Sequence, residues 1–202
     1  MPADGRQSGE PAPAPTIPGM APQIVVLGLG NPVLADDAVG LKVAEAFQRL
    51  LDARPLPGVI VLASTRAGFE LIDMLQGFRH ALIVDALELP EPRAGHVQLL
   101  DMAHVAGSVR LNMMHEISIT AAFELAARLG IPMPAQVEIY AVEAADTRTL
   151  SEELTAEVAA AVEPLAEQLY ARAAELAALY GCTADDTPEG DAPPSRVFYP
   201  PQ

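Results

Sequence analysis

The chain has 202 residues, of which 12 are Lys or Arg and 27 are Asp or Glu, so its formal net charge is −15 at neutral pH. A chain of this length with 50% hydrophobic residues can bury the core of one ordinary domain, which argues against global disorder. The acidic balance argues against nucleic acid and anionic membrane surfaces as partners, because no cluster of Lys and Arg offsets it.

Cysteine usage and the terminal sequences limit the compartment and the kind of site. The single cysteine, Cys182, rules out an intramolecular disulfide and a Cys-rich zinc site, which is typical of a reducing cytoplasm. The first 22 residues contain six prolines and no apolar run, so they predict neither a signal peptide nor a membrane anchor. No later apolar run is long enough to span a bilayer.

Both ends of the chain have the composition of tails. Residues 1–22 predict a disordered N-terminal tail and residues 182–202 a Pro-rich acidic one, because neither can bury enough apolar area to offset the entropy lost on ordering. The folded unit is then 23–181. In it, short apolar runs alternate with amphipathic stretches, which predicts an α/β domain with a parallel sheet covered on both faces. Strands are expected near 24–28, 58–63, 81–85, 96–100 and 136–142, and helices near 37–52, 68–76, 115–129 and 149–180.

The last predicted helix, 149–180, has the strongest pattern. Thr149 and Glu152 form a capping-box pair at its start, and Gly181 is a suitable C-terminal stop. Pro164 lies inside it and predicts a kink or a break. Apolar residues recur at steps of three and four, at Leu150, Leu154, Val158, Val162, Leu165 and Leu169.

The loop after the first strand is glycine-rich but does not fit a dinucleotide site. In 28–32 (GLGNP) the third glycine of the fingerprint would fall at Val33, and Asp36 and Asp37 at the helix start would repel a pyrophosphate. One interpretation makes Asp36 an N-cap and Asp37 a first-turn acid. The other takes two adjacent acids at the carboxyl end of a strand as a cation or proton-transfer site.

Two further polar residues occur where strands or helices meet loops. Asp85 ends an apolar strand, where a charge must be solvated, paired or ligated, and His115 stands where helical periodicity resumes. A doubly wound sheet would bring Asp37, Asp85 and His115 to one edge. Such a set could hold a divalent ion or act without metal in acid–base chemistry. The remaining histidines, His80, His96 and His104, carry no motif and are not expected in a site.

At these positions the chain resembles a known family. The segment 25-VVLGLGNPVLADDAVG-40 is similar to the N-terminal signature of the [NiFe]-hydrogenase maturation endopeptidases, and the likeness continues through 81-ALIVDAL-87 and the segment around His115. It covers essentially the whole folded unit. The resemblance implies a single three-layer α/β/α domain, with a twisted, mostly parallel five-stranded sheet, an antiparallel edge and helices on both faces.

The resemblance also implies one proteolytic event, the removal of a short C-terminal extension from a hydrogenase large-subunit precursor after nickel insertion. The Ni²⁺ would belong to the substrate and not be a permanent cofactor. Asp37, Asp85 and His115 would contact it, the two carboxylates would polarise water, and Asp36 would support them. A cytoplasmic, monomeric endopeptidase is expected. The alternatives are a non-catalytic nickel-handling or scaffold protein that binds the same precursor, and a small-molecule hydrolase or binding protein on this scaffold.

Two positions depart from the family pattern. The glycine that usually follows the acidic pair is Ala38 here, a change that a helical first turn tolerates. The family's Asp-Gly-containing loop after the second strand reads Ala63-Ser64-Thr65-Arg66. This loop could alter substrate fit, and Arg66 could meet an acidic group of the partner or be an ordinary exposed arginine.

Overall fold

The computed structural model describes residues 23–65, 68–101, 112–113, 116–182 and 198–199. All five predicted strands and all four predicted helices are present. In chain order the elements are β1 (Ile24–Leu29), the 3-10 turn η1 (Ala35–Ala38), α1 (Val39–Ala53), β2 (Val59–Ser64), α2 (Glu70–Leu75), β3 (His80–Glu88), β4 (Val97–Asp101), β5 (Asn112–Met113), α4 (Glu116–Leu129), β6 (Gln136–Ala144), α5 (Ala156–Tyr180) and β7 (Phe198–Tyr199).

The strands form one sheet in the order β4-β6-β3-β1-β2-β7. Strands β6, β3, β1 and β2 are parallel to their neighbours in this group, and β4 runs antiparallel to β6 at the edge. These five longer strands confirm the predicted mostly parallel sheet with an antiparallel edge. Two strands of two residues each are added to it: β5 pairs with the end of β3, and β7 pairs with the end of β2.

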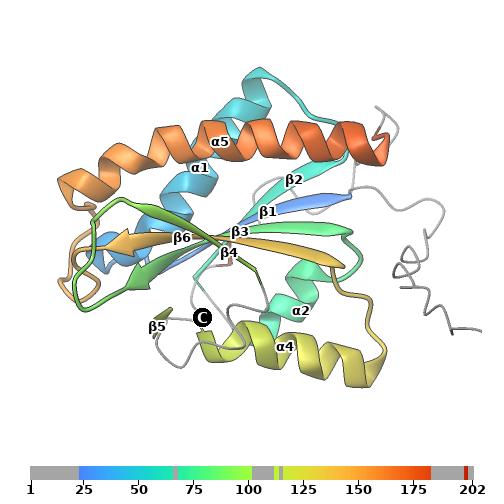
Figure 1. The fold of residues 1–202 in the computed structure, drawn as a ribbon, viewed down its shortest axis with the longest axis horizontal. Coiled ribbons are helices and arrows are strands. Elements are labelled where there is room, and N and C mark those ends of the chain that lie inside the picture. The colour runs from blue at the N-terminus through green and yellow to red at the C-terminus, as the bar shows by residue number, and fades with distance from the viewer. Residues whose placement is uncertain (1–22, 66–67, 102–111, 114–115, 183–197, 200–202) are drawn as a thin grey trace, which may run out of the picture.

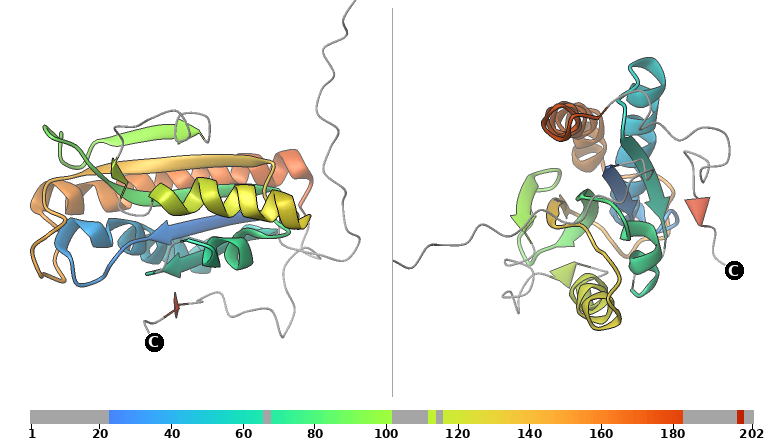
Figure 2. Two further views of the ribbon diagram at one scale, coloured as in Figure 1. Left: turned by 90° about the horizontal axis from the view of Figure 1, so that it is seen from below. Right: turned by 90° about the vertical axis from the view of Figure 1, so that its right-hand side faces the viewer.

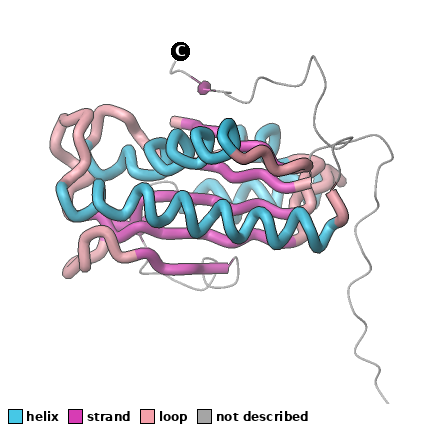
Figure 3. Tube along the Cα trace, turned by 90° about the horizontal axis from the view of Figure 1, so that it is seen from above, coloured by secondary structure: helices cyan, strands magenta, loops and turns pink. Residues whose placement is uncertain are grey.

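Helices cover both faces of the sheet, as predicted. Helices α1 and α5 lie on one face, and α2 and α4 lie on the other (Figure 1; Figure 3 shows the first face). Successive residues of β1 alternate between the two cores: Ile24 and Val26 pack under α1 and α5, and Val25 and Leu27 pack against α2 and α4. Because both faces are buried, the central strands carry continuous apolar runs.

The last helix begins later than its periodicity predicts. It starts at Ala156 with Thr155 as its N-cap, so the predicted start at Thr149 and the capping box there are wrong. The preceding segment is held in a turn instead, because the Asp146 carboxylate accepts hydrogen bonds from the N–H groups of Arg148 and Thr149. Leu150 is consequently 80% exposed and lies outside the apolar stripe.

The other two expectations for α5 have different outcomes. The helix runs through Pro164 as one element, so the predicted break is absent from Ala156–Tyr180. Its end is confirmed, because Gly181 has a left-handed conformation with φ 65°. The N–H of Cys182 then bonds back to the C=O of Ala177, which satisfies a terminal carbonyl of the helix.

Two residues within the predicted C-terminal tail belong to the sheet: Phe198 and Tyr199 form β7, the short red arrow in Figure 2. In the part of the chain that the structure describes, no helix is long and apolar enough to cross a membrane. The carboxyl ends of β1, β3 and β6, the turn η1 and the start of α5 gather at one end of the sheet, at the left in Figure 1. We call it the carboxyl edge, and the opposite end the amino edge.

Candidate functional site at the carboxyl edge

Two glycines allow α1 to approach the sheet backbone closely. A Cβ atom at Gly28 would lie 2.1 Å from the C=O oxygen of Gly40, and one at Gly40 would lie 2.2 Å from that of Leu29 and 2.4 Å from that of Val84. Any side chain at these positions would push the helix away from β1 and β3. The glycines therefore fix the start of α1, and the turn before it, directly over the ends of these two strands.

The turn η1 carries the acidic pair. It begins at Ala35, whose φ of +34° lies in a region that residues with a side chain adopt at a cost. This conformation is held from outside the turn, because the N–H of Ala35 donates to the C=O of Ser151 and the N–H of Asp36 donates to the C=O of Asp146. The loop 145–155, which joins β6 to α5, thus fixes the turn that presents both acids.

Asp36 is fully buried and holds this loop. Its Oδ1 accepts the N–H of Thr155 at 2.7 Å, and its Oδ2 accepts the N–H groups of Ala145 and Asp146 and the hydroxyl of Thr155. The N-cap interpretation of Asp36 is therefore wrong for its own helix, since Leu34 caps η1 and Ala38 caps α1. Asp36 instead binds the N-cap residue of α5. Four donors occupy its carboxylate, which fits the supporting role that the resemblance implies.

Asp37 is 1% exposed and lies beside the end of β1. Its C=O accepts the N–H of Asn31, and a Cβ atom at Gly30 would lie only 2.0 Å from the same oxygen. Gly30 is thus needed for Asp37 to come this close to the strand end.

Asp85 is 0% exposed and lies on β3, the strand next to β1. It directly follows Val84, the register partner of Gly28, and it pairs with Ala141 of β6 on its other side. Its Oδ1 accepts the N–H of Ala86 at 2.9 Å. The predicted strand end at Asp85 is wrong, because β3 continues to Glu88 and stays paired with β6. Asp85 is instead the first residue of β3 beyond its pairing with β1, so it still lies near the carboxyl edge, as Asp37 does.

His115, the third predicted site residue, lies outside the described residues, as do Arg66 and His104. Its described neighbours in the chain belong to this edge. Met113 of β5 pairs with Leu87, two residues after Asp85, and α4 begins at Glu116. In the described ranges no three His, Cys, Asp or Glu side chains are grouped as a metal site, and the predicted set with His115 stays a prediction.

A second polar cluster near this edge is centred on the buried acid Glu143 of β6, which the sequence analysis did not single out. It accepts hydrogen bonds from the N–H of Arg93, from His96 Nδ1 at 2.9 Å and from Gln98 Nε2 at 2.9 Å. Burial raises the pKa of Glu143, but these hydrogen bonds and the positive charge of Arg93 outweigh it and leave the pKa lowered. Its partners fasten the β3–β4 loop and the start of β4, which is a structural role.

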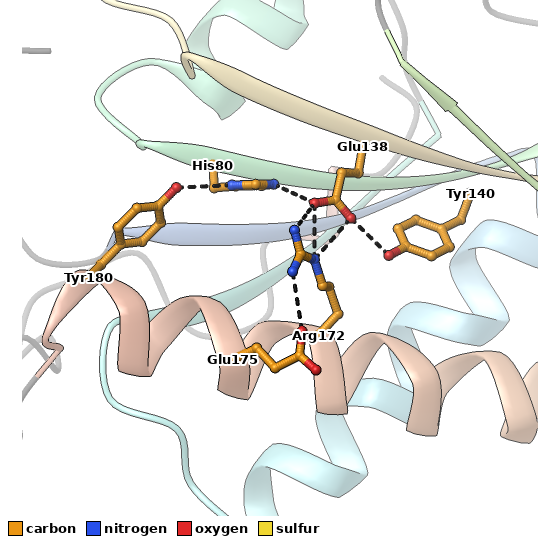
Figure 4. Close-up of polar contacts among 6 residues, drawn as sticks. All are labelled: His80, Glu138, Tyr140, Arg172, Glu175 and Tyr180. Atoms are coloured by element: carbon orange, nitrogen blue, oxygen red, sulfur yellow. Dashed lines mark hydrogen bonds and ion pairs between the residues drawn. The ribbon is translucent and has the colours of Figure 1, made fainter. Parts of the chain in front are cut away.

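A third polar cluster lies at the amino edge, between the sheet and the second half of α5 (Figure 4). Its centre is Glu138, which accepts hydrogen bonds from Arg172 Nη2 at 2.7 Å, His80 Nε2 at 3.0 Å and the Tyr140 hydroxyl at 3.0 Å. The hydroxyl of Tyr180 lies 3.1 Å from His80 Nδ1. Glu138 is a polar residue within the apolar run 136–142, and that interruption is the signal that could have found it.

Burial and neighbouring charges shift the pKa values of this amino-edge cluster in opposite directions. Burial lowers the pKa of His80, and the Glu138 carboxylate only partly offsets it. Burial also raises the pKa of Glu138, but hydrogen bonds from Arg172 and Tyr140 leave it lowered. His80 is therefore neutral and Glu138 ionised at neutral pH, and the cluster is a closed structural network rather than a second reaction site.

Comparisons with known proteins agree with the resemblance. Residues 41–172 match the family model described as hydrogenase maturation protease (HycI), a segment that begins just after Asp37 and includes Asp85 and His115. The chain is 34% identical over 80 residues to the hydrogenase 2 maturation protease of Escherichia coli strain K12, an alignment that covers 39% of this chain and 46% of that protein. The match thus spans less than half the length of this curated relative.

Solved structures share the fold. The hydrogenase maturating endopeptidase HybD from E. coli superposes with a TM-score of 0.61 at 24% identity, covering 76% of this chain and 93% of that one. The [NiFe] hydrogenase maturation protease HybD from Thermococcus kodakarensis gives a TM-score of 0.58 at 24% identity, covering 75% and 99%. Because the family model matches more than half of the chain and the fold agrees, the chain belongs to the hydrogenase maturation protease family.

Proposed function

We propose that this chain is an endopeptidase that removes the C-terminal extension of a [NiFe]-hydrogenase large-subunit precursor once nickel has been inserted. The observation that carries the proposal is the burial of two acids near the carboxyl edge: Asp37 beside the end of β1, and Asp85 at the first residue of β3 beyond its pairing with β1. Ligands of open α/β sheets bind at that edge, and two acids held there concentrate negative charge where a cation would dock. Membership in the family supplies the reaction.

In this proposal Asp37, Asp85 and His115 contact the nickel that the precursor already carries. Two carboxylate oxygens and one imidazole nitrogen are ligands that a borderline divalent ion accepts, and they leave coordination positions for the precursor's own ligands. The nickel is cargo of the substrate, so we expect no resident metal in the free protease. Binding it would position the scissile bond next to the two carboxylates.

The reaction is the hydrolysis of one peptide bond. The oxygen of a water molecule bonds to the carbonyl carbon, the C–N bond breaks, and the departing amine takes a proton that came from the water. We assign Asp37 and Asp85 to polarising this water and carrying its proton, since a positioned carboxylate can act first as base and then as acid. Asp36 takes no part in this transfer, because four donors already occupy its oxygens.

The net charge of −15 suggests how the two proteins meet. An acidic protease is steered toward a basic patch on its partner, and such steering weakens as salt screens the charges. We expect a cytoplasmic monomer that meets the precursor in a transient complex.

The test incubates the purified chain with nickel-loaded and nickel-free precursor from the same organism and measures the precursor's mass. Loss of a short C-terminal peptide from the nickel-loaded form alone is the expected result. Asp37→Asn should abolish this loss, while the matched control Asp52→Asn, on the exposed side of α1, should not. Cleavage of both forms would keep the protease but refute nickel recognition. A stable complex without cleavage would indicate the non-catalytic nickel-handling protein.

A further inference from the structure

The outer side of β2 is an open sheet edge that is filled only at its carboxyl end. Within the described residues, β2 pairs along its whole length with β1 on one side. On the other side it pairs in parallel with β7, opposite Ala63 and Ser64 alone. An edge strand presents backbone N–H and C=O groups that accept a further extended peptide.

The register identifies the backbone groups that face outward. The C=O of Ser64 accepts the N–H of Gly30, so Ser64 faces β1. Backbone groups of successive residues point to opposite sides of a strand, and those of Ala63 therefore face the open edge. With Ala63 opposite Phe198 and Ser64 opposite Tyr199, a parallel ladder places the N–H of Tyr199 against the C=O of Ala63.

This part of the edge lies next to the acidic site. Ser64 bonds to Gly30, and Gly30 in turn packs against the backbone of Asp37. A peptide that pairs in parallel with β2 runs toward the carboxyl edge, where Asp37 and Asp85 lie. The residues that follow the paired segment therefore come nearest to the two acids.

We propose that the carboxyl end of β2 is the docking edge for an extended segment of the precursor on the amino side of the scissile bond. The chain's own residues 198–199 hold this edge until the precursor displaces them. The inference rests on the proposed protease function and adds to it a binding mode and a built-in competitor.

The sequence of the tail explains why it can be displaced. Tyr199 is followed by Pro200 and Pro201. In a parallel ladder the next donor after Tyr199 is residue 201, and proline has no N–H. Proline at position 201 therefore cannot extend the ladder beyond the two paired residues. A precursor segment without proline at the equivalent position can form a longer ladder of backbone hydrogen bonds.

The test uses two variants of the full chain that differ in one backbone donor. Tyr199→Pro removes the N–H that faces Ala63, and the matched control Tyr199→Ala keeps it. When residues 198–199 are paired with β2 for most of the time, only a small fraction of the protein molecules can bind precursor at this edge. Tyr199→Pro should therefore lower the KM for nickel-loaded precursor about three- to tenfold at unchanged kcat. Tyr199→Ala should leave KM within about twofold. Amide exchange at Thr65 should accelerate about tenfold in Tyr199→Pro alone.

A binding measurement separates this inference from the proposed function. A fluorescein-labelled peptide of residues 195–202 should bind the Tyr199→Pro chain, and an unlabelled peptide spanning the precursor's cleavage region should displace it. If no variant cleaves precursor, the proposed function fails, and this displacement still decides whether the edge binds peptides. An unchanged KM in Tyr199→Pro, or no labelled peptide bound at millimolar concentration, would overturn the inference.

Discussion

Glu138 at the amino edge, and Asp36 and Asp85 at the carboxyl edge, are carboxylates whose described partners differ. At the amino edge, Glu138 is matched by the guanidinium of Arg172 and by donors from His80 and Tyr140. At the carboxyl edge, Asp36 is held by four neutral donors, and the described hydrogen bond of Asp85 comes from the neutral N–H of Ala86.

The partners of these carboxylates differ in what they do for the structure. A buried acid paired with arginine is neutralised locally, and it ties two elements together. The backbone N–H groups that donate to Asp36 and Asp85 fix the positions of these two carboxylates. The ion pair at the amino edge joins α5 to the sheet, and the hydrogen bonds of Asp36 join the loop 145–155 to η1.

The largest expected effect is on activity at the carboxyl edge. Asp85→Asn should lower kcat/KM for nickel-loaded precursor by about 10²-fold or more, because the amide neither carries the negative charge nor accepts a proton. Its free energy of unfolding should not fall. Glu138→Gln, the corresponding acid-to-amide change at the amino edge, should leave kcat/KM within about twofold. If Asp85→Asn and Glu138→Gln lowered kcat/KM equally, the acids at the two ends of the sheet would not differ in function.

The second expected effect is on the support of the site. Asp36→Asn should lower the free energy of unfolding by about 2–4 kcal/mol in urea denaturation, because an amide nitrogen would face the donors that one carboxylate oxygen now accepts. Asp146→Asn is the matched control, since the two backbone N–H groups that donate to its carboxylate both bond to the single oxygen Oδ1, which asparagine retains. If Asp146→Asn lowered the free energy of unfolding as much as Asp36→Asn does, the hydrogen bonds of Asp36 would not be what holds the loop.

At the amino edge, Arg172→Met should lower the free energy of unfolding by about 1–3 kcal/mol, because Glu138 loses its cation while its side chain is only 18% exposed. Arg49→Met removes an ion pair between α1 and α5 in which both side chains are largely exposed, so it should cost less than about 1 kcal/mol. Precursor cleavage by the folded Arg172→Met protein should stay at the wild-type rate. A reduced cleavage rate in Arg172→Met would show that the amino edge affects activity at the carboxyl edge.

The smallest expected effect is on the pH dependence of stability. Burial lowers the pKa of His80, so below the ordinary histidine pKa of 6.5 the unfolded chain binds the proton first. Stability therefore falls as the pH drops. Between about pH 7.5 and 5.5, wild-type protein should lose roughly 0.5–1 kcal/mol more than His80→Gln. Working above pH 5 keeps the titration of Glu138, whose pKa is lowered, out of the range. If the free energy of unfolding changed equally with pH in wild-type protein and in His80→Gln, a neutral His80 would be contradicted.

Much of the fold could be predicted because burial on both faces of a sheet leaves a strong local pattern. The strands near 24–28 and 136–142 are apolar runs, and the structure confirms them with small shifts of their ends. The start of α5 could not be predicted in this way. Helical periodicity at Leu150 was overridden by Asp146 and by contacts of Ser151 with the η1 region, which are far away in the sequence.

The site shows the same limit. The sequence predicts that Asp37 and Asp85 follow or end strands. The structure extends β3 three residues past Asp85, but the parallel pairing of β1 with β3 still places both acids near one edge. The sequence cannot separate the roles of the adjacent Asp36 and Asp37, because the difference depends on the loop 145–155 folding onto Asp36. Nor does local pattern reveal that Arg172 and His80 meet at Glu138, since the three residues come from different elements.

By itself, the sequence determined the layered α/β architecture, the two acids near one edge of the sheet and the family resemblance, because periodicity and motifs are properties of neighbouring residues. The tertiary structure decided that Asp36 supports the loop 145–155, where α5 begins, and that Phe198 and Tyr199 pair with the edge of β2. These outcomes depend on hydrogen bonds between segments far apart along the chain, and such contacts exist only once the sheet has formed.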